Sequence, residues 1–171
     1  MVALAACRAS ESPRQGQLEA RWTGADTGQL AGSAVGEWCD EQGRLEIRIV
    51  RGDTGLAVAV FPEVVLAPDT YRVVLAGSRD SAPPAARVAL RYFGPTAISG
   101  FQGDSGAVVL ERTDSGQLTG RVAARASSVS NSDRVTVTGK FENLAVIPQS
   151  RGCTADSPLE SAESADTDRV D

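Results

Sequence analysis

Gly103-Asp104-Ser105-Gly106 has the sequence expected around a nucleophilic serine. A serine hydroxyl attacks a carbonyl carbon only when a nearby base takes its proton, and histidine is the usual base. The chain contains no histidine. Lys140 is its single lysine, and the sequence gives no reason to place it beside Ser105. We therefore interpret the motif as a turn that leads into a strand.

Carboxylates are the next candidates for chemistry. Glu37, Asp40, Glu41 and Glu46 form the densest acidic group outside the C-terminal segment. A pair of carboxyl groups can hydrolyse a glycosidic bond as acid and base, but nothing in the pattern marks one of these as buried. Calcium loops of the Asp-x-Asp-x-Asp-Gly type are absent from the sequence, and the lack of histidine excludes His-ligated metals. We expect no catalytic residue, no metal and no cofactor.

Aromatic residues offer a ligand surface instead. The chain has 2 Trp, 2 Tyr and 4 Phe, and a core must use most of them. We name Trp22, Trp38 and Tyr92 as candidates for such a surface, although packing in the core is the competing role for both tryptophans. Because adjacent strand residues face opposite sides, one of Tyr92 and Phe93 must point outward.

The formal net charge of −5 belongs to one segment. Residues 154–171 contain six acids and one base, so residues 1–153 hold 16 acids and 16 bases. The part expected to fold has no basic excess for phosphates, which argues against nucleic-acid binding. We expect residues 154–171 to form a disordered acidic tail.

Leu4-Ala5-Ala6-Cys7 near the start of the chain resembles the lipobox of bacterial lipoproteins. The resemblance implies that Cys7 carries a diacylglycerol group and that residues 1–7 are the remnant of a lipoprotein signal peptide. Such a signal has about 7–15 apolar residues after a basic region, so on this interpretation it starts upstream. Residues 8–17 have the composition of a flexible linker. The opposing interpretation is a cytosolic protein with a short apolar N-terminus.

Two cysteines remain when Cys7 is lipidated. A pair of cysteines in an exported chain indicates one disulfide. Cys39 follows an early strand-like run, and Cys153 lies where the fold is expected to end. A Cys39–Cys153 bond would stabilise the fold by about 4–5 kcal/mol on the chain-entropy model. The alternative is two separate thiols.

Apolar and polar residues alternate with a period of two over most of the chain. Leu45-Glu46-Ile47-Arg48-Ile49 is one such half-buried strand, and turn residues separate similar runs at short intervals. The C-terminal half, which closes with Gly139-Lys140-Phe141, resembles small uncharacterised β-sandwich lipoproteins of bacteria. Their fold, an array of consecutive hairpins, is what this resemblance implies.

We predict one all-β domain over residues 18–153. It has about nine short strands and little or no helix, arranged as an antiparallel β-sandwich of jelly-roll or Ig-like type. A barrel is disfavoured because aromatic residues make up only 5% of the chain, too few to line a ligand cavity.

The function expected from these features is that of a non-enzymatic, exported module at the cell envelope. It is held to the membrane by lipid at Cys7 and has a structural role or binds a protein or glycan. The alternatives are an exported hydrolase that uses loop carboxylates and a cytosolic β domain without an anchor.

Overall fold

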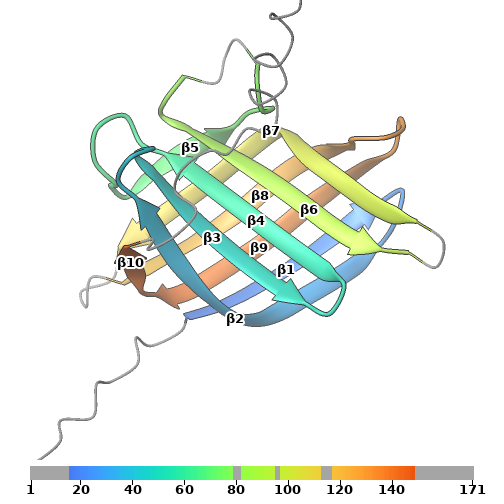
Figure 1. The fold of residues 1–171 in the computed structure, drawn as a ribbon, viewed down its shortest axis with the longest axis horizontal. Helices are drawn as coiled ribbons and strands as arrows, with labels where there is room; N and C mark the ends of the chain where they lie inside the picture. Colours follow the sequence, from blue (N-terminus) through green and yellow to red (C-terminus); the bar gives the residue numbers. More distant parts are fainter. Residues whose placement is uncertain (1–15, 79–81, 95–96, 113–116, 149–171) are drawn as a thin grey trace, which may run out of the picture.

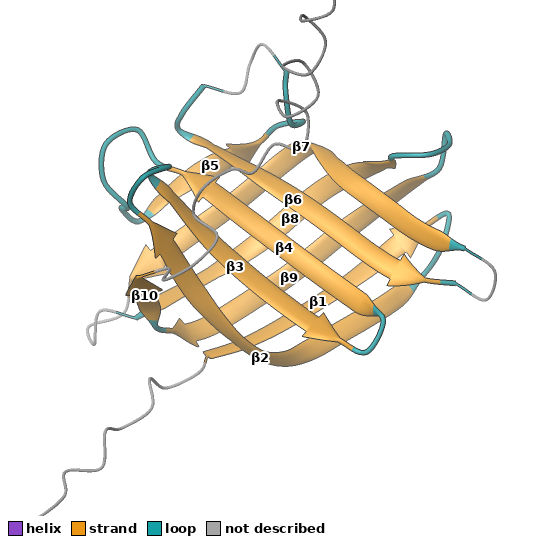
Figure 2. Ribbon diagram, in the orientation of Figure 1, coloured by secondary structure: helices purple, strands orange, loops and turns teal. Residues whose placement is uncertain are grey.

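A computed structural model describes residues 16–78, 82–94, 97–112 and 117–148, which form an all-β fold (Figure 1). The strands are β1 (Gly16–Gly24), β2 (Gly28–Cys39), β3 (Arg44–Arg51), β4 (Thr54–Phe61), β5 (Asp69–Val73), β6 (Ala85–Phe93), β7 (Ile98–Arg112), β8 (Leu118–Ser128), β9 (Arg134–Leu144) and β10 (Val146–Pro148). Strands and loops account for every described residue (Figure 2), so the expectation of an all-β chain with little or no helix is confirmed.

The outer segments of the predicted organisation lie outside the described residues. These are the signal remnant 1–7, most of the linker 8–17, and the acidic tail 154–171. The first strand begins at Gly16, two residues before the predicted start of the domain at 18. Within the described ranges, no helix has the length and apolarity needed to cross a membrane.

The strands follow the alternation that the sequence predicts. In β8, for example, Val122 and Ala124 are buried, whereas Ala123 between them and Arg121 and Arg125 on either side are exposed. One face of each such strand is apolar and can be buried only against other apolar faces. This pattern defines an inner and an outer surface for the whole sheet.

The sheet closes on itself. β1, β2, β3, β4, β6, β7, β8 and β9 pair in this order as antiparallel neighbours, and β1 pairs with both β2 and β9. β5 lies between one end of β6 and one end of β7, which gives a barrel of nine strands, and β10 pairs with β2 in parallel. The predicted β-sandwich of jelly-roll or Ig-like type is therefore wrong, because one continuous sheet closes into a barrel (Figure 1).

The physical reason for this correction lies in what fills the interior. A small barrel can be packed with side chains and needs no ligand cavity. Here the core is made mainly of Leu, Ile, Val and Ala, with Phe141 and Tyr71 as its largest fully buried members. No polar or charged residue among the described ones is fully buried. A low aromatic content is compatible with a filled barrel, so it does not favour a sandwich.

The barrel has two different ends. The turns β1–β2, β3–β4, β6–β7 and β8–β9 lie at one end, on the right in Figure 1, which we call the hairpin end. Gly16 and the long β4–β6 connection lie at the opposite end, called the terminal end, where β10 runs beside the last residues of β2.

The Gly103–Gly106 motif lies within β7 and does not form the predicted turn. A β-bulge between Gly103 and Ser105 inserts Asp104 as an extra residue opposite β8. Gly106 then has φ +119, and a Cβ there would lie 2.1 Å from the Ala123 carbonyl oxygen. Only glycine fits this close approach. The glycines and aspartate that resembled a turn serve to bend a long strand around the barrel.

Candidate functional site

Three aromatic rings meet at the hairpin end of the barrel. Tyr92 of β6 stacks with Trp22 of β1, with ring centroids 5.6 Å apart, and with Phe101 of β7 at 5.9 Å. Trp22 and Phe101 are buried, and Tyr92 is half-buried. The stack therefore links strands from separate parts of the wall and closes the apolar interior at this end.

Gly28 makes room for the stack. It pairs with Trp22 across the β1–β2 ladder, and a Cβ at this position would lie 2.1 Å from the indole ring. The indole consequently lies flat over the glycine backbone, where a larger residue would displace it.

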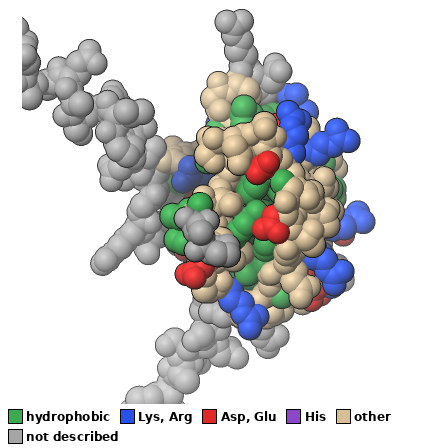
Figure 3. Space-filling model, turned by 90° about the vertical axis from the view of Figure 1, so that its right-hand side faces the viewer, with side chains coloured by type: hydrophobic (Ala, Val, Ile, Leu, Met, Phe, Trp, Pro, Cys, Tyr) green, Lys and Arg blue, Asp and Glu red, His purple; other side chains and the backbone are tan. Residues whose placement is uncertain are grey.

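A pocket of about 320 Å³ lies above the stack. Its walls come from the turns β1–β2, β6–β7 and β8–β9, and its lining consists of Ala25, Asp26, Tyr92, Gly94, Ala97, Ser99, Phe101, Ser128, Ser130, Asn131 and Asp133. Figure 3 looks onto this end of the barrel and shows hydrophobic side chains in the centre with acidic side chains beside them. The pocket thus combines an aromatic floor with hydroxyl, amide and carboxylate groups at its rim.

The Tyr92 hydroxyl connects the floor to the rim. Burial raises the pKa of Tyr92, and a hydrogen bond to the Asp26 carboxylate raises it further, whereas a hydrogen bond with Ser99 acts in the opposite direction. The carboxylates of Asp26 and Asp133 also raise this pKa through their charge. The phenol is therefore held in its neutral form as a hydrogen-bond donor.

The β8–β9 turn is fixed by its own polar side chains. The Ser128 hydroxyl accepts hydrogen bonds from the backbone N–H groups of Ser130 and Asn131. The Asn131 amide donates to the Asp133 carboxylate at 2.9 Å and accepts from the Asp133 backbone N–H at 2.9 Å. These contacts pre-organise one wall of the pocket, which lowers the entropy lost when a ligand binds.

The three predicted ligand-surface residues are divided between the two ends. Trp22 and Tyr92 come together in the aromatic stack, whereas Trp38 lies near the terminal end, where its Nε1 donates to Asp40 Oδ1 at 2.6 Å. Phe93 points outward and is 47% exposed, as the alternation within the Tyr92-Phe93 pair requires.

Sequence reasoning missed the other pocket residues, among them Phe101, Asp26 and Asp133. Asp26 and Asp133 belong to turn signals that the sequence shows, Asp26-Thr27-Gly28 and Asn131-Ser132-Asp133, whereas Phe101 lies inside a strand. In a barrel of consecutive hairpins every second turn lies at the same end. The signal could therefore have grouped these residues only if the barrel had been predicted.

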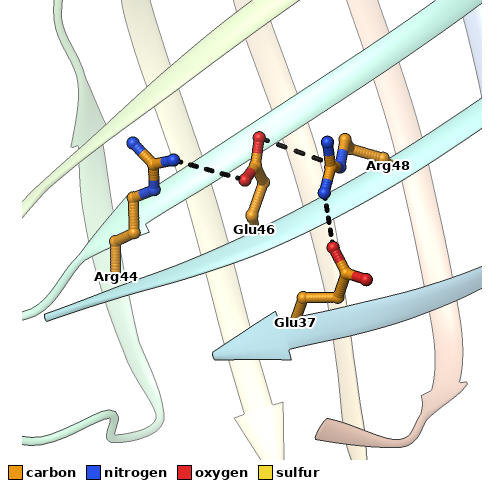
Figure 4. Close-up of polar contacts among 4 residues, drawn as sticks. All are labelled: Glu37, Arg44, Glu46 and Arg48. Carbon is orange, nitrogen blue, oxygen red and sulfur yellow. Dashed lines mark hydrogen bonds and ion pairs between the residues drawn. The ribbon is translucent and has the colours of Figure 1, made fainter. Parts of the chain in front are cut away.

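The acidic group around Glu37 forms ion pairs on the outer wall (Figure 4). Arg48 Nη2 contacts Glu37 at 2.5 Å and its Nε contacts Glu46 at 3.8 Å, while Arg44 Nη2 contacts Glu46 at 3.5 Å. The hydrogen bond to Glu37 is the largest cause that raises the pKa of Arg48. Both carboxylates are thus occupied by cross-strand and same-strand guanidinium groups.

Ser105 is bonded to an acid and not to a base. Its Oγ donates to Asp104 Oδ1 at 2.8 Å, and Asp104 Oδ2 accepts from Ser127 at 2.5 Å. The Ser127 bond is the main cause that lowers the pKa of Asp104, so this carboxylate stays ionised. Lys140 pairs with Glu142 at 3.4 Å and Glu19 at 3.7 Å on the outer wall. Among the described residues, the hydrogen-bond partner of the Ser105 hydroxyl is thus a carboxylate, and Lys140 pairs with other acids.

The structure describes one of the three cysteines on which predictions were made. Cys39 is fully buried at the end of β2, whereas Cys7 and Cys153 lie outside the described residues. Lipidation of Cys7 and the Cys39–Cys153 bond therefore stay predictions.

In the described part of the chain, no group of three or more Asp, Glu or Cys side chains is arranged to hold a metal ion.

Comparison with known proteins gives no relative: no protein family, no curated protein and no solved structure matches the chain. The proposed function therefore rests on the sequence and on the geometry of the pocket.

Proposed function

We propose that the protein is a non-enzymatic binding module of the cell envelope, anchored by lipid at Cys7, that holds a small hydroxyl-rich ligand such as a sugar unit at its hairpin end. The observation that carries this proposal is the pocket of about 320 Å³ that combines polar turn residues with an aromatic floor. Carboxylate and amide groups exchange hydrogen bonds with ligand hydroxyls, and aromatic edges and faces contact ligand C–H groups.

The position of the pocket agrees with an anchor at Cys7. The first described strand begins at Gly16, at the terminal end, and the pocket lies at the hairpin end. A linker of residues 8–15 would span at most about 28 Å when extended. An anchor at Cys7 would hold the terminal end near the membrane and turn the pocket away from it.

An exported hydrolase is the competing function, and one observation disfavours it. A catalytic acid at neutral pH needs an environment that keeps it protonated, usually burial. The two acids at the pocket, Asp26 and Asp133, are both exposed, and no acid among the described residues is fully buried. The pocket is better suited to hold a ligand than to cleave one.

Ligand binding is tested by following backbone amide resonances during titration with a panel of neutral mono- and disaccharides. We expect shifts at Asp26, Ser99 and Asn131, and their loss in the variant Asp26→Asn/Asp133→Asn. Asp53→Asn is the matched control, since Asp53 lies in the β3–β4 turn at the same end but does not line the pocket. Shifts that survive the double substitution would contradict the proposal.

Anchoring is tested by mass spectrometry of the membrane fraction after expression with the upstream sequence restored. A mature protein that begins at lipid-modified Cys7 supports the proposal. A mature protein that retains residues 1–6 contradicts it and favours a cytosolic β domain.

A further inference from the structure

The first half of β2 has a neighbouring strand on one side only. Residues 28–34 pair with β1, whereas the ladder with β3 is confined to residues 35–39 of β2. The ladder ends at the Val35–Arg48 pair, although β3 continues to Arg51. The barrel wall is therefore open between the early part of β2 and the end of β3.

Strand geometry fixes which backbone groups face this opening. In an antiparallel ladder, the N–H and C=O of alternate residues point to the same side. The Gly36 N–H donates to the Ala145 carbonyl on the side of β1 and β10, so even-numbered residues of β2 face that side. Gln29, Ala31 and Ser33 consequently direct their N–H and C=O groups into the opening. A row of this kind is a template for an added strand.

The open edge borders the outer groove of the barrel. A pocket of about 450 Å³ is lined by Glu19, Arg21, Gln29, Ala31, Arg51 and Thr54, with Ala20 and Leu30 beneath them. The Ala31 side chain is small, so it leaves the groove accessible beside the open edge of β2. The groove therefore gives an extended segment room to approach the exposed backbone groups.

The charge of the groove is positive. Glu19 contacts Lys140 at 3.7 Å, so its charge is already compensated. Within the described residues, neither Arg21 nor Arg51 lies at ion-pair distance from a carboxylate. Two guanidinium groups thus lack a carboxylate partner beside an unpaired strand edge.

Arg51 occupies the edge in the unbound protein. Its Nη1 donates to the Ala31 carbonyl oxygen at 3.0 Å, in the place where a neighbouring strand would put its N–H. An incoming backbone N–H can take over this carbonyl, and the guanidinium is then free to pair with an acidic side chain.

We propose that the open edge of β2 at Gln29, Ala31 and Ser33 binds an extended acidic peptide segment of a partner protein. The segment adds a strand to β2 and places carboxylates on Arg21 and Arg51. Main-chain hydrogen bonds supply the affinity in this mode of recognition, and alternate side chains supply the selectivity. This site is separate from the pocket at the hairpin end.

The probe for this proposal is a fluorescent eight-residue peptide of alternating Thr and Glu. Its neutral counterpart replaces each Glu with Gln. We expect the acidic peptide to bind about tenfold more tightly, as two exposed ion pairs would give. Amide resonances of Gln29, Ala31 and Ser33 should shift on binding. The double variant Arg21→Gln/Arg51→Gln should reduce the ratio of the two affinities to about one.

The hydrogen bonds of the added strand are tested on the peptide itself. N-methylation of one set of alternate residues blocks the edge that faces β2, and methylation of the other set blocks only the outer edge. One methylated peptide should lose binding and the other should keep it. The protein variant Ala31→Pro should also lose binding, because it removes an N–H that faces the opening and has no strand partner there.

Three results would overturn the proposal. The first is equal binding of the two methylated peptides, and the second is resonance shifts confined to residues away from β2. The third is the absence of any binding by the acidic peptide at 1 mM. The methylated peptides keep the test decisive even when the proline variant fails to fold.

Discussion

Trp22 of β1 and Gly28 of β2 lie opposite each other, and the indole ring occupies the space that a side chain at position 28 would need. A Cβ on Gly28 would lie 2.1 Å from the ring. The same ring stacks on Tyr92, which reaches the Asp26 carboxylate with its hydroxyl. Gly28 therefore contacts the pocket only indirectly, through the Trp22 ring that stacks on the pocket residue Tyr92.

Replacement of Gly28 by alanine should therefore destabilise the protein. The added methyl forces the buried indole to move, and overpacking of this kind costs about 1–3 kcal/mol. Urea denaturation measures the change. Gly55→Ala is the control, because a Cβ at Gly55 would make ordinary contacts at 3.5 Å, and it should change stability by less than about 0.5 kcal/mol. Equal effects of the two substitutions would contradict the assigned contact.

Asp104 should make the stability of the protein sensitive to acid. Its pKa in the folded state is lowered, first by the Ser127 hydrogen bond and also by Ser105 and the nearby Arg134 and Arg125. A lowered folded-state pKa stabilises the fold above the unfolded value, about 3.9 for aspartate. This stabilisation is lost as the pH falls through the folded-state pKa.

The measurement compares the free energy of unfolding of the wild type and Asp104→Asn from pH 7 to pH 2. The variant should be less stable at neutral pH, and the difference should shrink below about pH 4. Ser127→Ala should raise the pKa of Asp104 in a carboxyl NMR titration. A difference between wild type and variant that does not depend on pH would refute this assignment.

Hydrogen exchange should alternate along the first half of β2. The amides of Leu30 and Gly32 face β1 and should exchange slowly, whereas those of Gln29, Ala31 and Ser33 should exchange faster by on the order of 100-fold. Val35 is the internal control, because its amide faces the paired part of β3 and should be slow although its number is odd. Uniform protection along residues 28–34 would show that the wall is closed there.

The predicted Cys39–Cys153 bond is tested by peptide mapping without reduction. Cys39 is fully buried at the terminal end, in an environment where a bonded sulfur is protected from reductants. We expect one cross-linked peptide from exported protein and a higher midpoint of thermal unfolding than after substitution of both cysteines by serine. Two alkylated, unlinked thiols would exclude the bond.

The sequence was sufficient to predict the strands but not their closure. Alternation along residues such as Leu45 to Ile49 reports which face is buried, and that information is local. Closure depends on β1 pairing with β9, which are distant in sequence and carry no signal of partnership. A low aromatic content disfavours only a hollow barrel that lines a ligand cavity, whereas the interior of this barrel is filled mainly by aliphatic side chains.

The same limit explains the partial prediction of the site. The sequence offers Trp22 and Tyr92 as candidates because large aromatic residues are conspicuous when few are present, and of the two only Tyr92 lines the pocket. Asp26 and Asp133 are ordinary turn residues until the barrel brings their turns together. Ser105 stays a residue for which no catalytic role is predicted. The turn predicted at this motif is a bulge, and the two are confused because both require a flexible glycine and a short polar residue.

The closed ring also determines how the chain must reach its fold. The contacts β2–β3, β3–β4, β7–β8 and β8–β9 join strands that follow one another along the chain, so they form by short-range search. The β1–β9 ladder instead joins Gln17 to Glu142. Closure of so long a loop carries an entropic penalty that is recovered only after the intervening hairpins are in place. β1 and β9 should therefore pair last during folding. The β1–β9 ladder should also be the first to separate when force is applied to the two termini of the chain.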